Sequence, residues 1–473
     1  MATTTGTKRG LWSTIRRITA SDRISGLIML GFALAGLVLA NLPATAHTFE
    51  TIAETHLYIP HTNLDLPIGH WAQDGLLTVF FLTVGLELKQ ELTTGSLANP
   101  KAAAVPMLCA VGGMIAPPIL FLGVTALFSQ IGPGEPGTLI LTTTGSSIPF
   151  AEMSHGWAVP TATDIAFSLA VLALFAKALP GSIRAFLMTL ATVDDLLAII
   201  LIAVFFSSIN AWYWFIGIAV CAAIWAYLVR LKKVPWIVVG IVGILAWVMM
   251  FEAGIHPTLA GVLVGLLTPA REMYGELTPR AERYADKLQP FSALLALPIF
   301  ALFATGVHFE SMSPLLLASP LVIALIVALV VGKPLGIITT AWLATHVGGL
   351  KMAKGLRVRD MIPAAVACGI GFTVSFLIAS LAYKNAELSA EARFGVLVAS
   401  LIAAAISGVL LSRQSKRFEK AAAAEALADA EANGSIDGDG TGQSSRTTKP
   451  TTPTEYPGTL ADGTASVEID FRH

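Results

Sequence analysis

The sequence predicts an all-α polytopic membrane protein with about twelve transmembrane helices. The chain of 473 residues is 55% hydrophobic and only 13% charged, which is too apolar for a soluble globular domain. Apolar runs of roughly 17–25 residues recur, and most can cross a hydrocarbon core of about 30 Å. The twelve spans are centred on residues 26–42, 71–88, 102–128, 157–176, 183–207, 212–227, 235–251, 255–267, 288–306, 320–344, 361–383 and 394–411.

The distribution of basic residues supports the number of spans and gives an orientation. The N-terminal segment, every second loop and the segment after the last span are rich in Lys and Arg. The loops between them contain only Lys384 and Arg393. Because Lys and Arg collect on the cytoplasmic side of a membrane, we expect both termini to be cytoplasmic.

The composition divides the chain into three regions. We expect a cytoplasmic N-terminal segment over residues 1–20, a transmembrane domain over 21–412 and a largely disordered cytoplasmic tail over 413–473. Residues 418–432 can continue as a helix, but the sequence beyond them is too polar to bury a core. Cys109, Cys221 and Cys368 lie in separate apolar runs, which favours small buried hydrophobic residues over a disulfide or a metal site. The net charge of −1 gives no indication of a nucleic-acid partner.

Lys333 is the one basic residue within a long apolar run, between Leu321 and Trp342. A cation at bilayer depth costs at least ~2.5–3.5 kcal/mol, so it must face a partner or a water-filled cavity. Asp164, Asp194 and Asp195 lie in similarly apolar spans and are the candidate partners. Three buried acids and one buried base indicate an ion pathway.

Two spans contain helix-breaking sequences near their centres. The fourth contains Pro160 followed by Thr161, Thr163 and Asp164, and the eleventh contains Gly369-Ile370-Gly371. Breaks at corresponding places in two halves mark transporter sites, and spans three to five and ten to twelve would form an inverted repeat. We expect the interrupted helices to cross at mid-membrane, with Asp164 offsetting positive helix ends and Lys333 negative ones.

The adjacent Asp194 and Asp195 cannot share one task, because neighbours on a helix project ~100° apart. We expect Asp194 to pair with Lys333 and Asp195 to face a water-filled cavity. A carboxylate there, supported by a threonine or a backbone carbonyl, suits sodium and can also bind a proton. Competition between the two ions for one carboxylate is sufficient for exchange.

The charges at the surface have ordinary interpretations. Glu87 lies where the second span meets the cytoplasm, where it either caps the helix or belongs to an ion-entry funnel. His256 has the character of an interfacial histidine. Glu272, Glu282 and Arg283, in the eighth loop, are expected to be solvated.

Five motifs in order along residues 21–411 resemble the NhaA family of bacterial sodium/proton antiporters. They are Phe80-Phe81-Leu82-Thr83-Val84-Gly85-Leu86-Glu87, Thr163-Asp164-Ile165-Ala166-Phe167, Val193-Asp194-Asp195-Leu196, Gly332-Lys333-Pro334-Leu335-Gly336 and Cys368-Gly369-Ile370-Gly371-Phe372-Thr373.

The resemblance implies a twelve-helix fold in a bacterial plasma membrane and electrogenic exchange of sodium or lithium for protons, serving sodium and pH homeostasis. It implies ion binding by Asp195 with Asp194 nearby, charge compensation by Asp164 and Lys333, and support from Thr163. The transported ions and membrane lipid are the expected partners, together with a homodimer; no enzymatic activity, cofactor or nucleic acid is expected. Ala304 departs from the family pattern, where an asparagine is usual, and the eighth loop lacks the histidine of the family's pH-responsive region.

Three other functions use similar residues. A sodium-coupled symporter could use the same acids for a different cargo, and is distinguished by sodium-driven uptake of a solute. An intramembrane aspartyl protease needs Gly-x-Gly-Asp, but Gly371 is followed by Phe372. A plain cation channel is disfavoured because Lys333 would repel the permeant ion.

Overall fold

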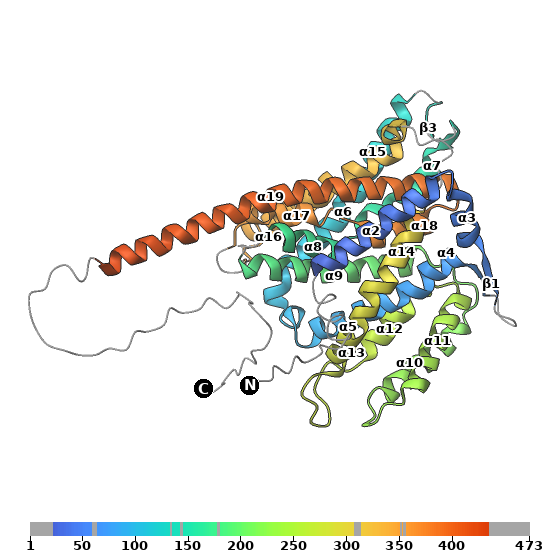
Figure 1. Ribbon diagram of the computed structural model, residues 1–473, viewed down its shortest axis with the longest axis horizontal. Coiled ribbons are helices and arrows are strands. Elements are labelled where there is room, and N and C mark those ends of the chain that lie inside the picture. The colour runs from blue at the N-terminus through green and yellow to red at the C-terminus, as the bar shows by residue number, and fades with distance from the viewer. Residues whose placement is uncertain are drawn as a thin grey trace, which may run out of the picture.

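The protein is almost entirely helical (Figure 1). The computed structural model describes residues 22–58, 64–132, 135–141, 145–176, 180–306, 314–350, 352 and 356–434. The predicted N-terminal segment of residues 1–20 and the tail beyond Gly434 lie outside the described residues.

Each of the twelve predicted spans coincides with helical structure. The first six segments are α2 (Asp22–Asn41), α4–η1–α5 (Ile68–His70, Trp71–Leu76, Leu77–Thr93), α6 (Pro100–Ile131), α7–η3–α8 (Phe150–Ser154, His155–Thr161, Ile165–Phe175), α9 (Gly181–Phe205) and α10 (Trp214–Leu228). The other six are α11 (Trp236–Ala253), α12 (Leu259–Leu267), α13–η4–α14 (Arg280–Phe291, Ser292–Ala296, Leu297–Thr305), α15–η6–α16 (Pro320–Ile326, Val327–Gly332, Lys333–His346), η7–α17–α18 (Val358–Met361, Ile362–Ala367, Phe372–Ala382) and α19 (Ala386–Gly434).

Short elements connect these segments. They are α3 (Ala46–Glu54), β1 (His56–Tyr58), β2 (Asp65–Pro67), η2 (Ser96–Ala98), β3 (Thr138–Ile140), β4 (Ser147–Pro149) and η5 (Pro314–Ala318). The strands form two antiparallel hairpins, with Leu57 opposite Leu66 and Leu139 opposite Ile148. The second hairpin lies between α6 and α7, in the segment that joins the third and fourth predicted spans.

Length and composition support a membrane-spanning fold. Among the described residues, seven helices are long and apolar enough to cross a membrane, and nine are if each of two bent pairs counts as one span. The predicted all-α polytopic fold is confirmed. The full count of twelve crossings and the inverted repeat stay predictions.

Lys333 follows a π-helical turn, and the local sequence explains why. Pro334 has no N–H to donate to the carbonyl four residues earlier, and its ring crowds that carbonyl. The wider π turn of η6, ending at Gly332, accommodates this interruption. The same arrangement recurs where η4 precedes Pro298 at the start of α14. Such π turns are frequent at functional sites.

Small residues allow two pairs of helices to approach closely. A Cβ added to Gly85 of α5 would lie 2.7 Å from the carbonyl oxygen of Val262 in α12. A Cβ on Gly112 of α6 would lie 2.6 Å from the carbonyl oxygen of Gly336 in α16. Close contact through glycine is a common way to pack helices in lipid. The second contact fixes α16, which carries Lys333, against α6.

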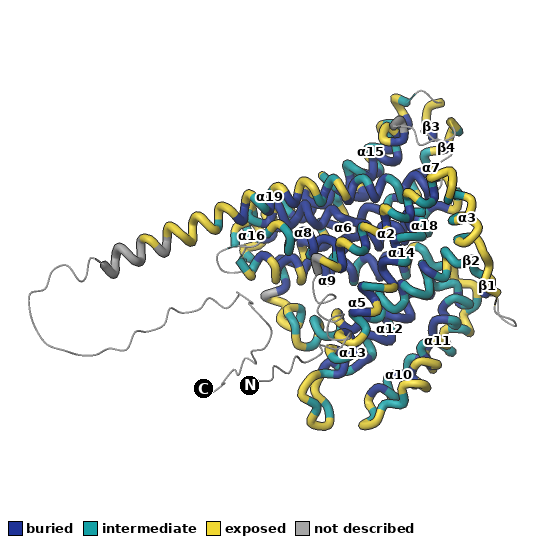
Figure 2. The backbone as a smooth tube through the Cα atoms, viewed as in Figure 1, coloured by how far each residue is buried: buried dark blue, intermediate teal, exposed yellow. Residues whose placement is uncertain are grey.

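Buried residues concentrate in the central helices, whereas α10 and α11 lie at the edge of the molecule (Figures 1 and 2). Their outer faces are apolar and exposed, as at Ile237, which is 82% exposed, and Ile244. Apolar side chains facing outward suit a hydrocarbon environment. The bundle that surrounds α8, α9 and α18 is therefore the part that can hold a charged site away from lipid.

The eighth loop is less solvated than the sequence predicted. Arg280 is only 1% exposed; it donates hydrogen bonds to the Glu276 carboxylate and to the backbone carbonyls of Val229 and Leu231. Arg283 lies 3.3 Å from the same carboxylate, so the prediction that Arg283 is merely solvated is wrong. The charges near this loop attach the start of α13 to the end of α10.

Candidate functional site

The fourth helical segment is interrupted at the predicted place. The helix pair on either side of residues 162–164 is bent by 50°. Asp164 is the N-cap of α8, and its Oδ1 accepts a hydrogen bond of 2.9 Å from the N–H of Phe167. The extended backbone at Ala162 separates this cap from η3, which ends at Thr161.

The eleventh segment is interrupted in the same way, with a bend of 58° between α17 and α18. The N–H of Thr373, in the first turn of α18, donates to Asp164 Oδ2 at 3.2 Å. One carboxylate, 3% exposed, therefore serves the N-termini of both α8 and α18. Because helix N-termini carry partial positive charge, the negative charge of Asp164 is stabilising there.

The carboxyl end of α17 accepts hydrogen bonds from the other interrupted helix. Thr163 Oγ1 donates to the carbonyl of Cys368 at 2.9 Å, and Ser168 Oγ donates to that of Ala367 at 2.8 Å. The N–H of Asp164 donates to the carbonyl of Ile370 at 2.7 Å. These bonds join the two breaks directly, as the predicted crossing requires.

Ser168 was not among the sequence candidates. Its position four residues after Asp164, on the same face of α8, was the available signal.

Lys333 lies at the remaining negative helix end. Its Nζ donates to the carbonyl of Thr161, the last residue of η3, and to Asp194 Oδ2 at 2.8 Å. Both charged side chains are buried, at 0% and 1% exposure. The expected contact between Lys333 and Asp194 is present. The described contacts place Lys333 at one negative end, while hydroxyl and N–H donors serve the end of α17.

Asp195 faces a different environment from its neighbour. It lines a cavity of about 410 Å³ together with Thr83 and Glu87 of α5 and Ile165 of α8. Among the described residues, no hydrogen bond or ion pair joins the Asp195 carboxylate to another side chain, and its buried Oδ1 has no partner. A buried carboxylate oxygen without a donor is costly unless a proton or cation binds it.

The cavity extends from Asp195 to polar residues nearer the surface. Glu87 is exposed, and Arg184 and Gln289 also line the wall. Thr83 and Glu87 are one turn apart on α5, so both can face the same space. The location of Glu87 fits the predicted entry funnel. Thr83 was missed as a separate candidate, although its spacing from Glu87 was available in the sequence.

Comparison with known proteins identifies the family. The family described as Na+/H+ antiporter 1 matches residues 16–411. The chain belongs to the NhaA family of sodium/proton antiporters. The resemblance inferred from five motifs is thus confirmed.

Individual NhaA relatives match along most or all of the chain. A Na(+)/H(+) antiporter NhaA of Bifidobacterium longum is 93% identical over 473 residues and covers 100% of both chains. The protein of the same name from Bifidobacterium breve is 86% identical over 472 residues, again covering 100% of both chains. Na(+)/H(+) antiporter NhaA 2 of Rhodococcus jostii is 41% identical over 392 residues, covering 82% of this chain and 90% of its own.

Proposed function

We propose that this chain exchanges sodium for protons across a bacterial plasma membrane, with the carboxylate of Asp195 as the shared binding group. The activity follows from membership of the NhaA family and from the names of its relatives. The same evidence disfavours the alternative of a solute symporter. The observation that carries the residue assignment is the buried carboxylate of Asp195 on the wall of a cavity, with no side-chain partner within the described part of the chain.

Oxygen chemistry in the cavity supports sodium as the cargo. Sodium is a hard cation, and the Asp195 carboxylate offers it oxygen ligands inside a region of low polarity. A proton binds to the same oxygens, so the two ions exclude one another. Binding of sodium from one side releases a proton, and binding of a proton from the other side releases sodium.

The ion pair of Asp194 and Lys333 lies beside Asp195, which directly follows Asp194 in the sequence. Lys333 neutralises Asp194 while it also stabilises the end of η3. Electrogenic exchange requires unequal numbers of sodium ions and protons, so a second titratable group must take part. Asp194 and Lys333, 2.8 Å apart, are the two groups placed for that role.

The direction of exchange follows from the orientation. We propose that both termini are cytoplasmic, because the basic loops all lie on their side. Glu87 and Arg184 then line the cytoplasmic mouth of the cavity. Cytoplasmic sodium, or lithium, enters there and leaves outside in return for protons. Homodimer formation stays a prediction from the family resemblance.

A binding experiment isolates the exchange step from transport. Sodium is added to the purified full-length protein in weakly buffered detergent solution, and proton release is followed with a pH-sensitive dye. We expect stoichiometric release at alkaline pH with sodium or lithium and none with Asp195→Asn. The matched control is Asp286→Asn, which neutralises an exposed carboxylate of α13. Absence of release at every pH would contradict the shared-site mechanism.

The transport experiment uses proteoliposomes with an imposed sodium gradient. Wild-type protein should move protons in response to sodium, and a membrane potential should change the rate if exchange is electrogenic. Labelled amino acids or sugars should not accumulate, which separates the antiporter from a symporter.

A further inference from the structure

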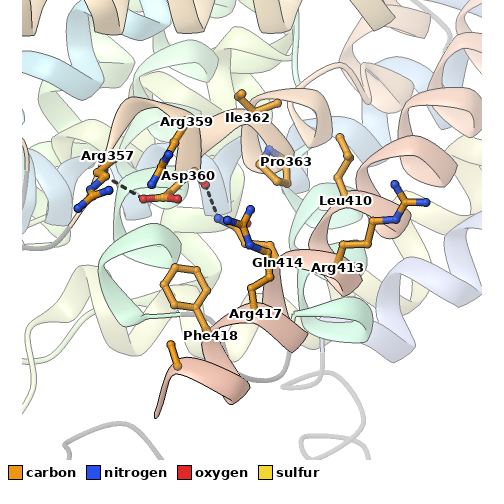
Figure 3. Close-up of a pocket in the computed structure, with 11 residues that line it drawn as sticks. Arg357, Arg359, Asp360, Ile362, Pro363, Leu410, Arg413, Gln414, Arg417 and Phe418 are labelled. Carbon is orange, nitrogen blue, oxygen red and sulfur yellow. Dashed lines mark hydrogen bonds between the residues drawn. The ribbon is translucent and has the colours of Figure 1, made fainter. Parts of the chain in front are cut away.

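A second cavity, distant in sequence from Asp195, lies where α17 begins and α19 leaves the bundle (Figure 3). Its volume is about 690 Å³. The lining residues are Arg357, Arg359, Asp360, Ile362, Pro363, Leu410, Arg413, Gln414, Arg417, Phe418 and Ala421. Two arginines come from the segment that leads into α17 and two come from α19. We call this cavity the basic pocket.

The charge of the basic pocket is not balanced. Its four arginines are exposed, and Asp360 is the one acidic residue of its lining. Among the described residues, no carboxylate lies within ion-pairing distance of any of the four guanidinium groups. The Asp360 carboxylate instead accepts from the N–H of Arg357 at 3.3 Å. A net positive charge in a concave site favours an anion.

A buried amide holds the two sides of the basic pocket together. Gln414 is 9% exposed, and its Nε2 donates to the carbonyl of Asp360 at 2.7 Å. This bond links α19 to the segment before α17 (Figure 3). The two pairs of arginines are therefore held in a fixed position relative to one another.

The remaining wall is apolar and continues into the membrane-spanning part of the helices. Ile362, which is 39% exposed, and Pro363 begin α17, and Leu410 lies in the last predicted span. The arginines thus stand at the boundary between apolar helix and polar surface. A ligand that satisfies both parts needs an anionic group next to a hydrocarbon group.

We propose that the basic pocket binds the phosphate of an anionic phospholipid, with the start of its acyl chain against Ile362 and Leu410. Guanidinium groups suit phosphate because they donate parallel, charge-assisted hydrogen bonds. Basic pockets between helices at a membrane surface recognise such headgroups. A soluble phosphate would satisfy the arginines alone and leave the apolar wall unused.

Lipid bound here would connect α17 to α19 more tightly. The far end of α17 accepts the hydrogen bonds from Thr163 and Ser168 that join the two interrupted helices. The lipid would therefore stabilise the element on which the helix crossing depends, without touching the ion-binding carboxylates.

The test measures lipid binding to the purified full-length protein by native mass spectrometry, with thermal unfolding as a second measurement. Phosphatidylglycerol is the probe, and phosphatidylcholine is the lipid without net charge. We expect tighter binding of phosphatidylglycerol, a higher Tm in its presence, and roughly tenfold weaker binding in Arg413→Gln/Arg417→Gln. The variant Arg413→Lys/Arg417→Lys keeps the charge and should lose less.

Control variants separate the basic pocket from general surface charge. Lys416→Gln/Lys420→Gln removes two exposed cations of α19 that do not line the basic pocket and should leave binding unchanged. Equal loss in both double glutamine variants would overturn the site, because bulk electrostatics would then explain the preference. Preserved preference for phosphatidylglycerol in a folded Arg413→Gln/Arg417→Gln protein would also overturn it.

Two further comparisons identify the occupant. Inorganic phosphate at millimolar concentration should neither displace the lipid nor raise the Tm; if it does both, the ligand is a soluble anion and the proposal fails. Removal of residues 435–473, which include Asp437 and Asp439, should leave lipid affinity unchanged. If lipid binds only after this deletion, the tail occupies the pocket and the proposal also fails.

Discussion

Among the residues that the structure describes, one arginine and one lysine are almost completely buried, and their surroundings differ in an informative way. Arg280, which is 1% exposed, has its hydrogen bonds directed to one carboxylate and two backbone carbonyls. Lys333, which is 0% exposed, contacts one oxygen of Asp194 and one backbone carbonyl. Both satisfy the rule that a buried charge needs a partner.

The difference lies next to each pair. Near Arg280, the additional charge of Arg283 also contacts Glu276, so the cluster serves as a connection between helices. Beside the pair of Lys333 and Asp194 stands Asp195, whose carboxylate faces a cavity. A buried ion pair alone indicates structure. A buried ion pair beside an acid without a side-chain partner indicates a site that binds something from solution.

Neutralising the acid that faces the cavity should have the largest effect on transport. Asp195→Asn removes the group that binds either ion, so we expect exchange to fall to background, at least about a hundredfold, because an amide does not titrate. The folded state should lose no stability, since no described side chain pairs with Asp195. Sodium-dependent proton flux in proteoliposomes and the Tm measure the two effects. Wild-type flux in this variant would refute the assignment.

Asp194→Asn should instead damage both transport and stability. The substitution leaves Lys333 buried without its anion, which costs about 3–5 kcal/mol when one partner of a buried pair is removed. We expect a lower Tm and severely impaired exchange.

The companion variant Asp194→Asn/Lys333→Met removes both charges and should recover most of the lost Tm. It should not recover exchange. A Tm for Asp194→Asn equal to that of wild type would show that the pair is not energetically important.

Glu276→Gln breaks the second buried cluster and should leave exchange close to wild type. Hydrogen bonds from Arg280 hold the pKa of Glu276 below its usual value of 4.5. The carboxylate therefore adds stability above that pH, and this contribution is lost as the pH falls through the lower pKa of the folded protein. We expect a loss of about 1–2 kcal/mol at pH 7, because the carboxylate is partly solvated.

Thermal unfolding of the wild type and Glu276→Gln at several pH values tests this sign. The difference in Tm should be largest near neutrality and should shrink in acid. A difference that grows as the pH falls would contradict the argument.

The contrast between the two cations also explains what sequence could predict. Lys333 interrupts a long apolar run, so its burial and its need for an acidic partner follow from sequence alone. Arg280 lies among other charges, and its burial depends on the carbonyls of Val229 and Leu231, which are about fifty positions away. Tertiary contacts of that kind leave no local pattern.

The candidate site shows the same division. The helix breaks near Pro160 and Gly369 could be predicted from the sequence, because proline and closely spaced glycines disrupt helices. The hydroxyl donors to the end of α17 could be predicted only in part, since a serine in an apolar helix usually donates to a carbonyl within its own helix. Ser168 instead donates to the carbonyl of Ala367, which comes from the other half of the chain. This tertiary contact cannot be predicted from the sequence around Ser168.

Thr163→Val should destabilise the crossing between the interrupted helices by less than the two preceding substitutions destabilise the protein. It removes the hydroxyl that donates to the carbonyl of Cys368 while it keeps the shape of the side chain. We expect a loss of about 1 kcal/mol, the usual net value of such a bond, and a modest reduction in exchange. Thr339→Val is the control, because its hydroxyl bonds within α16 on an exposed face. Equal Tm values for the two variants would argue against a role in the crossing.

Removing residues 434–473 should have the smallest effect, because α19 has left the helical bundle before residue 434 (Figure 1). Among the side chains of α19 that the structure describes, the last buried ones are Gln414 and Ser415, and residues 419 to 424 are exposed (Figure 2). The helix has therefore left the bundle before the deletion begins, and no described contact of either cation is lost. We expect exchange within about twofold of wild type and an unchanged Tm, since surface changes away from buried features cost little. Reduced exchange by a truncated protein that inserts and purifies normally would assign the tail a part in transport that neither cation site explains.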